Sequence, residues 1–156
     1  MTTQRIETAF GPIEVRPGQL WSIAGSLAGF PELRHFVLLD VACHRPLVWL
    51  QAIEDPSVCF ALAAPATFSL AYPPVPTEAL FGTPAAETLL MLMVILERQG
   101  QGRIVPQPHR LAPLCFDLRR KRLTQWILAN PRAVTTITFP VTQVPAPPLE
   151  PIAVNA

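Results

Sequence analysis

The sequence lacks most of the motifs that enzymes use for catalysis or for binding phosphate and metal ions. Its seven glycines form no glycine-rich phosphate loop. No serine lies in a nucleophile-elbow motif, and no acidic cluster has the spacing of a calcium loop. Three scattered histidines do not make a metal site. These absences argue against an enzyme and predict a protein without a metal ion or a cofactor.

Cysteine is also scarce. Cys43, Cys59 and Cys115 are an odd number at wide spacing, which matches neither a disulfide framework nor a zinc site. We interpret Cys59 as a small hydrophobe, because free cysteine is among the most buried residue types. An enzyme built on Cys59 or His109 stays an alternative, and it requires an unusual titration at one of them.

Long hydrophobic runs are absent. The longest one, Leu89–Leu96, is far shorter than the roughly 20 residues that span a bilayer. We therefore expect a core element and no membrane attachment, and both helix and strand stay open for this run. The first residues, Met1–Glu7, lack the basic start and apolar segment of a signal peptide, so we expect a cytoplasmic protein.

Apolar residues and proline are abundant. Half of the 156 residues are apolar, so one domain can bury a sizeable core without disulfides or metal. Nineteen prolines divide the chain into short pieces, which suits short strands joined by turns. We therefore predict an all-β fold. The expected strands cover residues 6–9, 13–15, 35–39, 47–53, 58–63, 89–96, 104–105, 111–116, 123–128 and 135–139.

One short helix and a tail complete the predicted organisation. Thr77 could cap a helix over residues 78–81, with Gly82 ending it. From Pro140 onward the last 17 residues contain five prolines and no apolar periodicity. We therefore predict a β domain over residues 1–140 and a Pro-rich, disordered tail over residues 141–156.

Two acidic residues, Glu54 and Asp55, stand before Pro56 between two apolar runs. Asp tolerates turn conformations, and Pro cannot donate a hydrogen bond in a central strand, so this pattern predicts a turn. Turns that join rigid strands are ordinary places for binding residues. A partner contact by these acids is therefore a compatible hypothesis.

Charge is distributed unevenly. The net charge of +1 combines −3 in residues 1–78 with +4 in residues 79–156. Only the segment Arg119, Arg120, Lys121 and Arg122 comes near a block of like charge. A solvated hairpin tip is the simplest interpretation, and a basic grip on phosphate or on an acidic protein is the alternative. RNA-binding signatures are missing, which disfavours nucleic acid as the partner.

The order of short motifs over residues 4–140 resembles the bacterial flagellar assembly factor FliW family. Each motif alone is weak evidence, but their shared order along most of the chain is strong. The matching motifs are Phe10-Gly11 with Ile13-Glu14-Val15, Gly29-Phe30 with residues 36–39, Trp49-Leu50-Gln51, Asp55-Pro56, Phe60, Pro65, Phe68 with Tyr72, Leu111-Ala112-Pro113, and residues 125–128 with Asn130.

The resemblance implies a small barrel-like antiparallel β domain with one short helix and no catalysis. Proteins of this family bind flagellin in the cytoplasm and also bind CsrA, a translational regulator that represses flagellin synthesis, and the two partners exclude one another. Export of flagellin frees the factor to antagonise CsrA, which couples the flagellin level to its translation. The candidate partner-binding residues are Phe30, Glu54, Asp55, Tyr72, Arg119, Arg120 and Arg122.

The chain also departs from the family pattern. Members are commonly acidic, whereas this chain is near neutral, and His109 stands where many members have Asn before Leu111-Ala112-Pro113. Two alternatives follow. One is a diverged β-barrel interaction module that binds flagellin but not CsrA, and the other is a module that binds nucleic acid through Arg119–Arg122.

Overall fold

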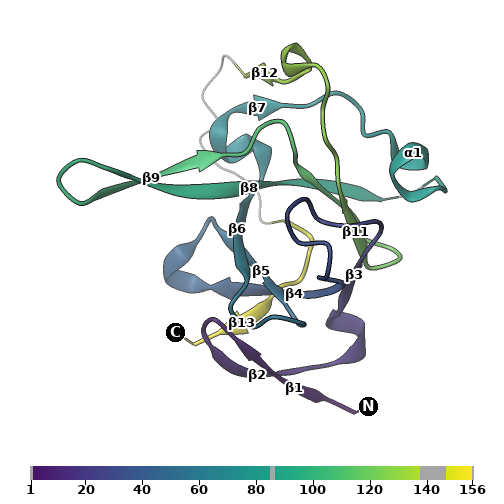
Figure 1. Cartoon of the computed structure of the whole chain (residues 1–156), viewed down its shortest axis with the longest axis vertical. Coiled ribbons are helices and arrows are strands. Elements are labelled where there is room, and N and C mark those ends of the chain that lie inside the picture. The colour runs from purple at the N-terminus through teal and green to yellow at the C-terminus, as the bar shows by residue number, and fades with distance from the viewer. Residues whose placement is uncertain (1, 85–86, 138–146, 156) are drawn as a thin grey trace.

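The computed structural model describes residues 2–84, 87–137 and 147–155 of the chain. Short strands dominate it, and α1 (Thr77–Phe81) is the one α-helix among the described residues (Figure 1). The strands are β1 (Gln4–Thr8), β2 (Gly11–Val15), β3 (Trp21–Ile23), β4 (His35–Val41), β5 (Val48–Ala52), β6 (Cys59–Ala63), β7 (Leu70–Ala71), β8 (Thr88–Gln99), β9 (Arg103–Pro108), β10 (Leu114–Asp117), β11 (Arg122–Gln125), β12 (Thr135–Thr136) and β13 (Ile152–Val154). The predicted all-β fold with one short helix is confirmed.

The body is a sheet that closes on itself. Its strands follow the order β10-β11-β3-β4-β5-β6-β8, and β8 pairs back with β10. The pairings around this ring are antiparallel except for β11 with β3, and β13 adds a second parallel pairing beside β4. The predicted barrel-like antiparallel sheet is therefore confirmed, with these two pairs as exceptions.

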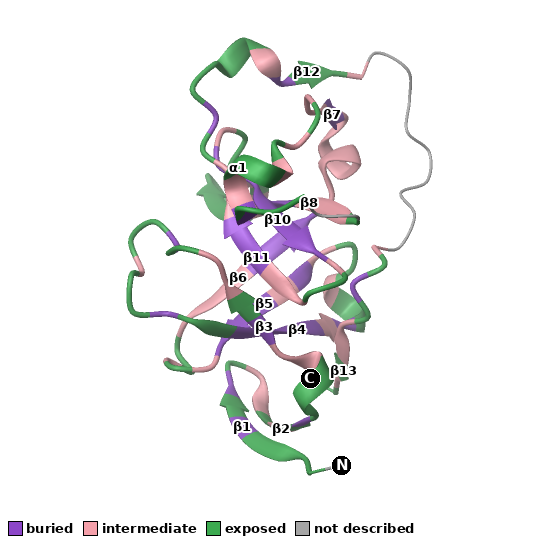
Figure 2. Ribbon diagram, turned by 90° about the vertical axis from the view of Figure 1, so that its right-hand side faces the viewer, coloured by how far each residue is buried: buried purple, intermediate pink, exposed green. Residues whose placement is uncertain are grey.

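Alternation along the strands decides which side chains fill the barrel. On β6, Phe60 and Leu62 belong to the main core cluster, whereas Ala61 and Ala63 lie on the outer face. The largest fully buried side chains of the core include Trp21, Phe36 and Phe116, and Figure 2 shows the buried strands at the centre of the molecule. Burial raises the pKa of Cys59 to about 12, which fits its predicted role as a small hydrophobe.

Two outer layers cover parts of the barrel. The β1–β2 hairpin lies at one end (Figure 1, purple), and its Ile6 and Val15 form a cluster with Val37 and Leu39 of β4. At the opposite end, β7 pairs with β12, and Leu70 packs with side chains from β8 and from the segment after β11. The described part of the chain has no helix with the length and apolar character needed to cross a membrane.

The C-terminal segment corrects the predicted disorder for residues 147–155. Leu149 is only 1% exposed and joins the barrel core, and β13 pairs in parallel with β4. Its pairing partner lies far away in the sequence, so no local periodicity marks the strand. The rest of the predicted tail, residues 141–146, and the end of the predicted strand 135–139 lie outside the described residues.

Two local predictions change in detail. α1 begins at Thr77 directly after Pro76, and no side chain caps it, so the predicted Thr77 cap is wrong. Gly82 ends the helix with φ 75°, as expected for a C-terminal glycine. The ambiguous run 89–96 forms a strand, because β8 covers it and continues to Gln99.

Candidate protein-interaction surfaces

Glu54 and Asp55 lie in the turn between β5 and β6, as predicted. Glu54 Oε1 accepts hydrogen bonds from the backbone N–H groups of Arg34 (2.7 Å) and His35 (2.9 Å), and Oε2 lies 2.8 Å from His35 Nδ1. Partial burial raises the pKa of Glu54, but these bonds outweigh burial, and the pKa is lowered. Asp55 Oδ1 accepts from the Ser57 N–H (3.1 Å) and hydroxyl (2.6 Å). Both carboxylates therefore shape this end of the barrel, and Glu54 also stays exposed.

Phe30 belongs to the loop that approaches this turn. Gly29, with φ 86°, allows the chain to bend before it, and the Phe30 N–H donates to the Leu27 carbonyl (2.9 Å). The Phe30 ring packs edge-on against Phe60, with 5.2 Å between ring centroids. Because the same loop leads to the residues that bind Glu54, the structure places Phe30 and the acidic turn in one region.

The basic segment forms the tip of the β10–β11 hairpin, as predicted. The Asp117 side chain, only 1% exposed, accepts at Oδ1 from the N–H groups of Arg119 (3.2 Å) and Arg120 (3.3 Å). Its Oδ2 accepts from Arg122 Nε (2.8 Å). Burial raises the pKa of Asp117, but the hydrogen bonds from Arg122 and the backbone outweigh it, so the pKa is lowered. The tip is therefore organised around one buried carboxylate.

Arg122 is part of the fold. Its side chain is 19% exposed and also donates to the Phe81 carbonyl (3.2 Å) and to the Thr83 hydroxyl (2.8 Å). Its guanidinium lies over the Phe81 ring, 4.7 Å from the centroid. Arg119 and Arg120 are exposed, although Arg120 also donates to Thr83. Arg119 and Arg120 of the predicted basic contact thus face solvent, while the hydrogen bonds of Arg122 connect the hairpin to the α1 segment.

Tyr72 lies in another part of the molecule. It packs in the outer cluster with Leu70, and its hydroxyl donates to the Arg110 carbonyl. Burial raises the pKa of Tyr72. In the described chain, no hydrogen bond or ion pair links Tyr72 or the basic tip to the acidic turn. The seven predicted residues are therefore spread over three places: Phe30, Glu54 and Asp55 come together at one, Arg119, Arg120 and Arg122 at the hairpin tip, and Tyr72 lies apart from both.

Sequence reasoning missed an exposed apolar surface on the outer part of β8 and on β9. Strands β8 and β9 leave the barrel as a two-stranded arm (Figure 1). Ile95 is 59% exposed, Leu96 48% and Ile104 57%. The run 89–96 was expected to be buried throughout, yet its second half lies on this arm. The arm turns at Gln101 and Gly102, whose φ values of 64° and 74° match a tight hairpin turn.

A hollow of about 430 Å³ opens where the arm leaves the barrel. Its lining residues are Trp49, Cys59, Phe60, Ala61, Met93, Val94, Ile95, Leu96 and His109. We call these residues, together with Ile104, the arm surface. Cys59 and Ala61 are small side chains of the outer β6 face. The Trp49 Nε1–H is satisfied by His44 Nδ1 (3.1 Å), so the ring can make apolar contacts without leaving a donor unpaired.

The chemistry of the arm surface suits binding. Burial keeps Cys59 a neutral thiol at physiological pH, whereas a nucleophilic cysteine needs a lowered pKa. Among the described residues, no group of three or more His, Cys, Asp or Glu side chains could hold a metal ion. Apolar side chains around a hollow can instead bury the apolar face of another protein.

Comparisons with known proteins agree with this architecture. The family model described as FliW protein matches residues 4–139. Flagellar assembly factor FliW 2 of Desulfotalea psychrophila is 28% identical over 138 residues, covering 86% of this chain and 89% of that protein. The flagellar assembly factor FliW of Thermotoga maritima is 29% identical over 127 residues, covering 80% of this chain and 85% of that protein.

A solved structure gives the same fold. A crystal structure of the flagellar assembly factor FliW superposes with a TM-score of 0.69 at 22% sequence identity, covering 88% of this chain and 98% of that chain. The family match extends over nearly all of the barrel and ends before the C-terminal segment that carries β13. The chain belongs to the FliW family.

Proposed function

We propose that this chain is a non-catalytic flagellar assembly factor that binds flagellin in the cytoplasm through the arm surface and antagonises CsrA through the charged turn at Glu54-Asp55. The observation that carries the proposal is the exposed apolar arm surface on a member of the FliW family. Because the two partners exclude one another, flagellin lowers the concentration of free antagonist, which couples flagellin level to translation.

The arm surface fits an amphipathic helix better than a charged surface. The family relationship implies that the ends of flagellin present helices, and such helices dock an apolar stripe into apolar grooves. Ile95 and Leu96 are about half exposed, so a partner can bury apolar area there. Neighbouring side chains of a strand point to opposite faces, so a helix packed on one face buries one of the two. Burial of the exposed half of one such side chain is worth about 1 kcal/mol of binding free energy, because full burial is worth about 1.5–3 kcal/mol.

A flagellin titration tests this assignment. The variant Ile95→Ser/Leu96→Ser should weaken flagellin binding roughly fivefold, since a loss of about 1 kcal/mol corresponds to that factor when each 1.4 kcal/mol is tenfold in Kd. Ile127→Ser is the matched control, because Ile127 is 68% exposed but lies outside the arm surface. Calorimetry against purified flagellin gives both affinities, and melting curves verify folding. Equal affinity of the wild type and the arm variant would contradict the proposal.

A second titration tests the charged turn. The change Glu54→Gln/Asp55→Asn removes two charges but keeps the acceptor oxygens that bind Arg34, His35 and Ser57. CsrA binding should weaken and its association should slow, most of all at low salt, while flagellin binding changes less. Glu7→Gln/Glu14→Gln on the outer β1–β2 hairpin is the control for net charge. Equal losses for both partners would contradict this division between surfaces.

Two alternatives have distinct outcomes in the same experiments. If the wild type binds flagellin and not CsrA, the chain is a diverged flagellin-binding module. If it binds RNA through the hairpin tip, Arg119→Gln/Arg120→Gln should weaken that binding and lower its dependence on salt concentration. Arg122 is left unchanged in that test because it stabilises the fold.

A further inference from the structure

We propose that the outer edge of β4 is a docking site for an extended peptide. The C-terminal segment Pro147–Asn155 of this chain occupies the site and can be displaced from it. This inference is independent of the proposed function, because it rests only on this segment and on the surface of β4 that it covers. Leu39 pairs with Trp49 of β5 on one side and with Ile152 of β13 on the other. Strand β3 pairs with only the first two residues of β4 on that second side, which leaves the edge at Leu39–Val41 to β13.

The segment binds its seat through a simple pattern of apolar side chains. Leu149 is the deep anchor in the barrel core, and Ile152 and Val154 pack against the outer cluster of Val37 and Leu39. Ala153 lies between them and is exposed. The pattern is therefore an apolar residue at position 1 that enters the core and apolar residues at positions 4 and 6 that share the other face, and strand addition selects alternate side chains of this second kind.

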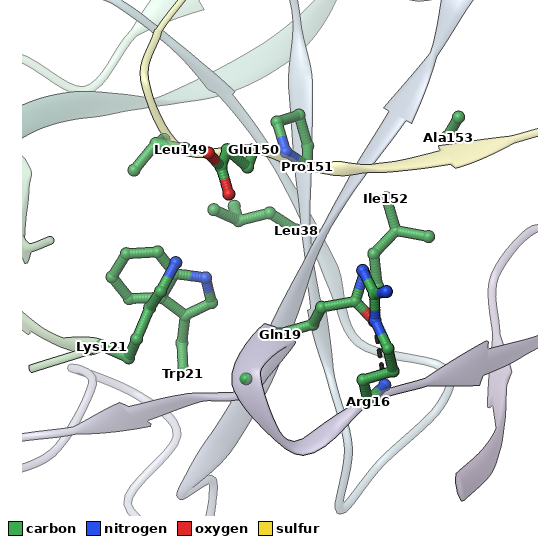
Figure 3. Close-up of a pocket in the computed structure, with 11 residues that line it drawn as sticks. Arg16, Gln19, Trp21, Leu38, Lys121, Leu149, Glu150, Pro151, Ile152 and Ala153 are labelled. Atoms are coloured by element: carbon green, nitrogen blue, oxygen red, sulfur yellow. Dashed lines mark hydrogen bonds between the residues drawn. The ribbon is translucent and has the colours of Figure 1, made fainter. Parts of the chain in front are cut away.

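The site that holds the C-terminal segment is wider than the segment itself. On one side a hollow of about 490 Å³ lies between the segment and the residues Arg16, Gln19, Trp21 and Lys121 (Figure 3). On the other side a hollow of about 460 Å³ is lined by Asp40, Arg45, Leu47 and by Pro147 and Pro151 of the segment. The segment thus covers this trough without filling it, and a larger side chain has room on either flank.

The attachment is also limited and partly strained. Only three residue pairs join β13 to β4. Pro147, Pro148 and Pro151 have no N–H to donate, so they add no ladder hydrogen bonds. Glu150 has φ 49°, a left-handed conformation that a residue with a side chain seldom adopts and that detachment releases. Small, weakly bonded units of this kind open locally without unfolding the domain.

The charges around the first hollow indicate which peptide the site prefers. Arg16 and Lys121 line it together with Glu150 of the segment, and Figure 3 shows Glu150 on the side that faces Trp21 and Lys121. Among the described residues, neither Arg16 nor Lys121 takes part in an ion pair. The preferred occupant is therefore an extended peptide with an acidic residue directly after its first apolar anchor.

Release of the segment leaves an unpaired strand edge. The N–H and C=O groups of Leu39–Val41 that face β13 then lack partners, and an unpaired edge accepts another strand. The C-terminal segment therefore acts as an intramolecular competitor, and its high effective concentration keeps the site closed to weak peptides.

The probe is a fluorescent synthetic peptide with the sequence of residues 147–156. It should bind the full-length variant Leu149→Ala/Ile152→Ala, whose resident segment is weakened, at least about tenfold more tightly than the wild type, where the segment competes at high effective concentration. The control peptide carries the same two alanines and should bind neither protein. Anisotropy titrations give the affinities. Equal and negligible binding of the probe to both proteins would overturn the proposal.

Hydrogen exchange of the unmodified wild type provides a second measurement that needs no variant. Amides of Ile152–Val154 should exchange at denaturant concentrations that leave the exchange of β5 and β6 amides unchanged, because the segment opens on its own. Protection of these amides equal to that of the barrel strands would show that the segment is a fixed part of the barrel. That result would overturn the proposal even if the variant failed to fold.

Discussion

Arg122 provides the sharpest test of how the hairpin tip is built. The change Arg122→Ala removes the donor to Asp117 Oδ2, the bonds to Phe81 and Thr83, and the cation over the Phe81 ring. Breaking a buried ion pair by removing one partner costs about 3–5 kcal/mol. The cost here lies toward the lower end, about 3 kcal/mol, because Arg122 is partly exposed and Asp117 keeps two backbone donors.

Urea unfolding measures this cost. A loss of about 3 kcal/mol should lower the midpoint without changing the slope, and it should lower Tm by roughly 6–12 °C for a domain of this size. Arg119→Ala, an exposed neighbour, should stay within about 0.5 kcal/mol of the wild type. The double change Asp117→Asn/Arg122→Met should cost less than the sum of its single changes, because neither charge is then left alone. An Arg122→Ala protein as stable as Arg119→Ala would refute the buried-pair argument.

Three further changes test other parts of the structure. The lowered pKa of Asp117 means that its carboxylate binds fewer protons in the folded state than in the unfolded state. The contribution of Asp117 to stability should therefore be fully present above the ordinary pKa of 3.8 and be lost as the pH falls through the lower pKa of the folded state. Asp117→Asn should flatten this acid dependence in urea midpoints measured at several pH values, and an unchanged dependence would assign it to other groups. Trp49→Ala should lower stability by about 2 kcal/mol, less than the 3–5 kcal/mol of a fully buried aromatic, because Trp49 is only half-buried; complete unfolding would show a greater role in the core. Leu149→Ala should cost about 2–3 kcal/mol while the exposed Ala153→Ser is neutral, and equal melting curves for the two would mean that the C-terminal segment is not docked.

Local chemistry explains which parts of the fold the sequence could predict. The strands 47–53 and 58–63 alternate or run apolar on both sides of Glu54-Asp55-Pro56, and the turn between them follows from side-chain and backbone preferences of adjacent residues. Strands β3 and β13 carry no comparable signal. Each is three residues long, and each pairs with a strand distant in the sequence, β3 with β11 and β13 with β4, so tertiary pairing and not local pattern defines them.

The candidate site could be predicted only in part, for a related reason. Glu54 and Asp55 were found because their turn is local, but the use of Glu54 to bind Arg34 and His35 depends on the position of another strand. The pairing of Asp117 with Arg122 could have been inferred, since opposite charges at facing positions of a hairpin attract. Ile95 and Leu96 could not be separated from the buried half of their run, because hydrophobicity alone does not tell which residues lie beyond the barrel.

The arm and the β4 edge illustrate two ways of presenting a binding surface on one sheet. On the arm, Met91 and Leu92 at the inner end of β8 are buried, while Ile95 and Leu96 farther out are exposed. Such an apolar outer strand usually invites edge-to-edge pairing. Here β9 carries Pro106 and Pro108 opposite Leu96 and Val94. Because proline cannot donate to a neighbouring strand, these positions fit an edge that resists strand addition.

The consequence is a difference in the partners that the two surfaces can accept. The arm offers exposed apolar side chains, and the prolines of its β9 edge disfavour strand addition there, so it suits a partner that packs against a face, as a helix does. The edge of β4 at Leu39–Val41 offers backbone groups and is covered by β13, so it suits an extended chain. Trp49 lines the arm hollow and also belongs to the cluster of Val37 and Leu39 on which β13 packs, so a change there affects both surfaces. The two proposed binding events should instead be separable by changes at Leu96 on the arm and at Leu149 in the C-terminal segment, because each of these residues belongs to one surface alone.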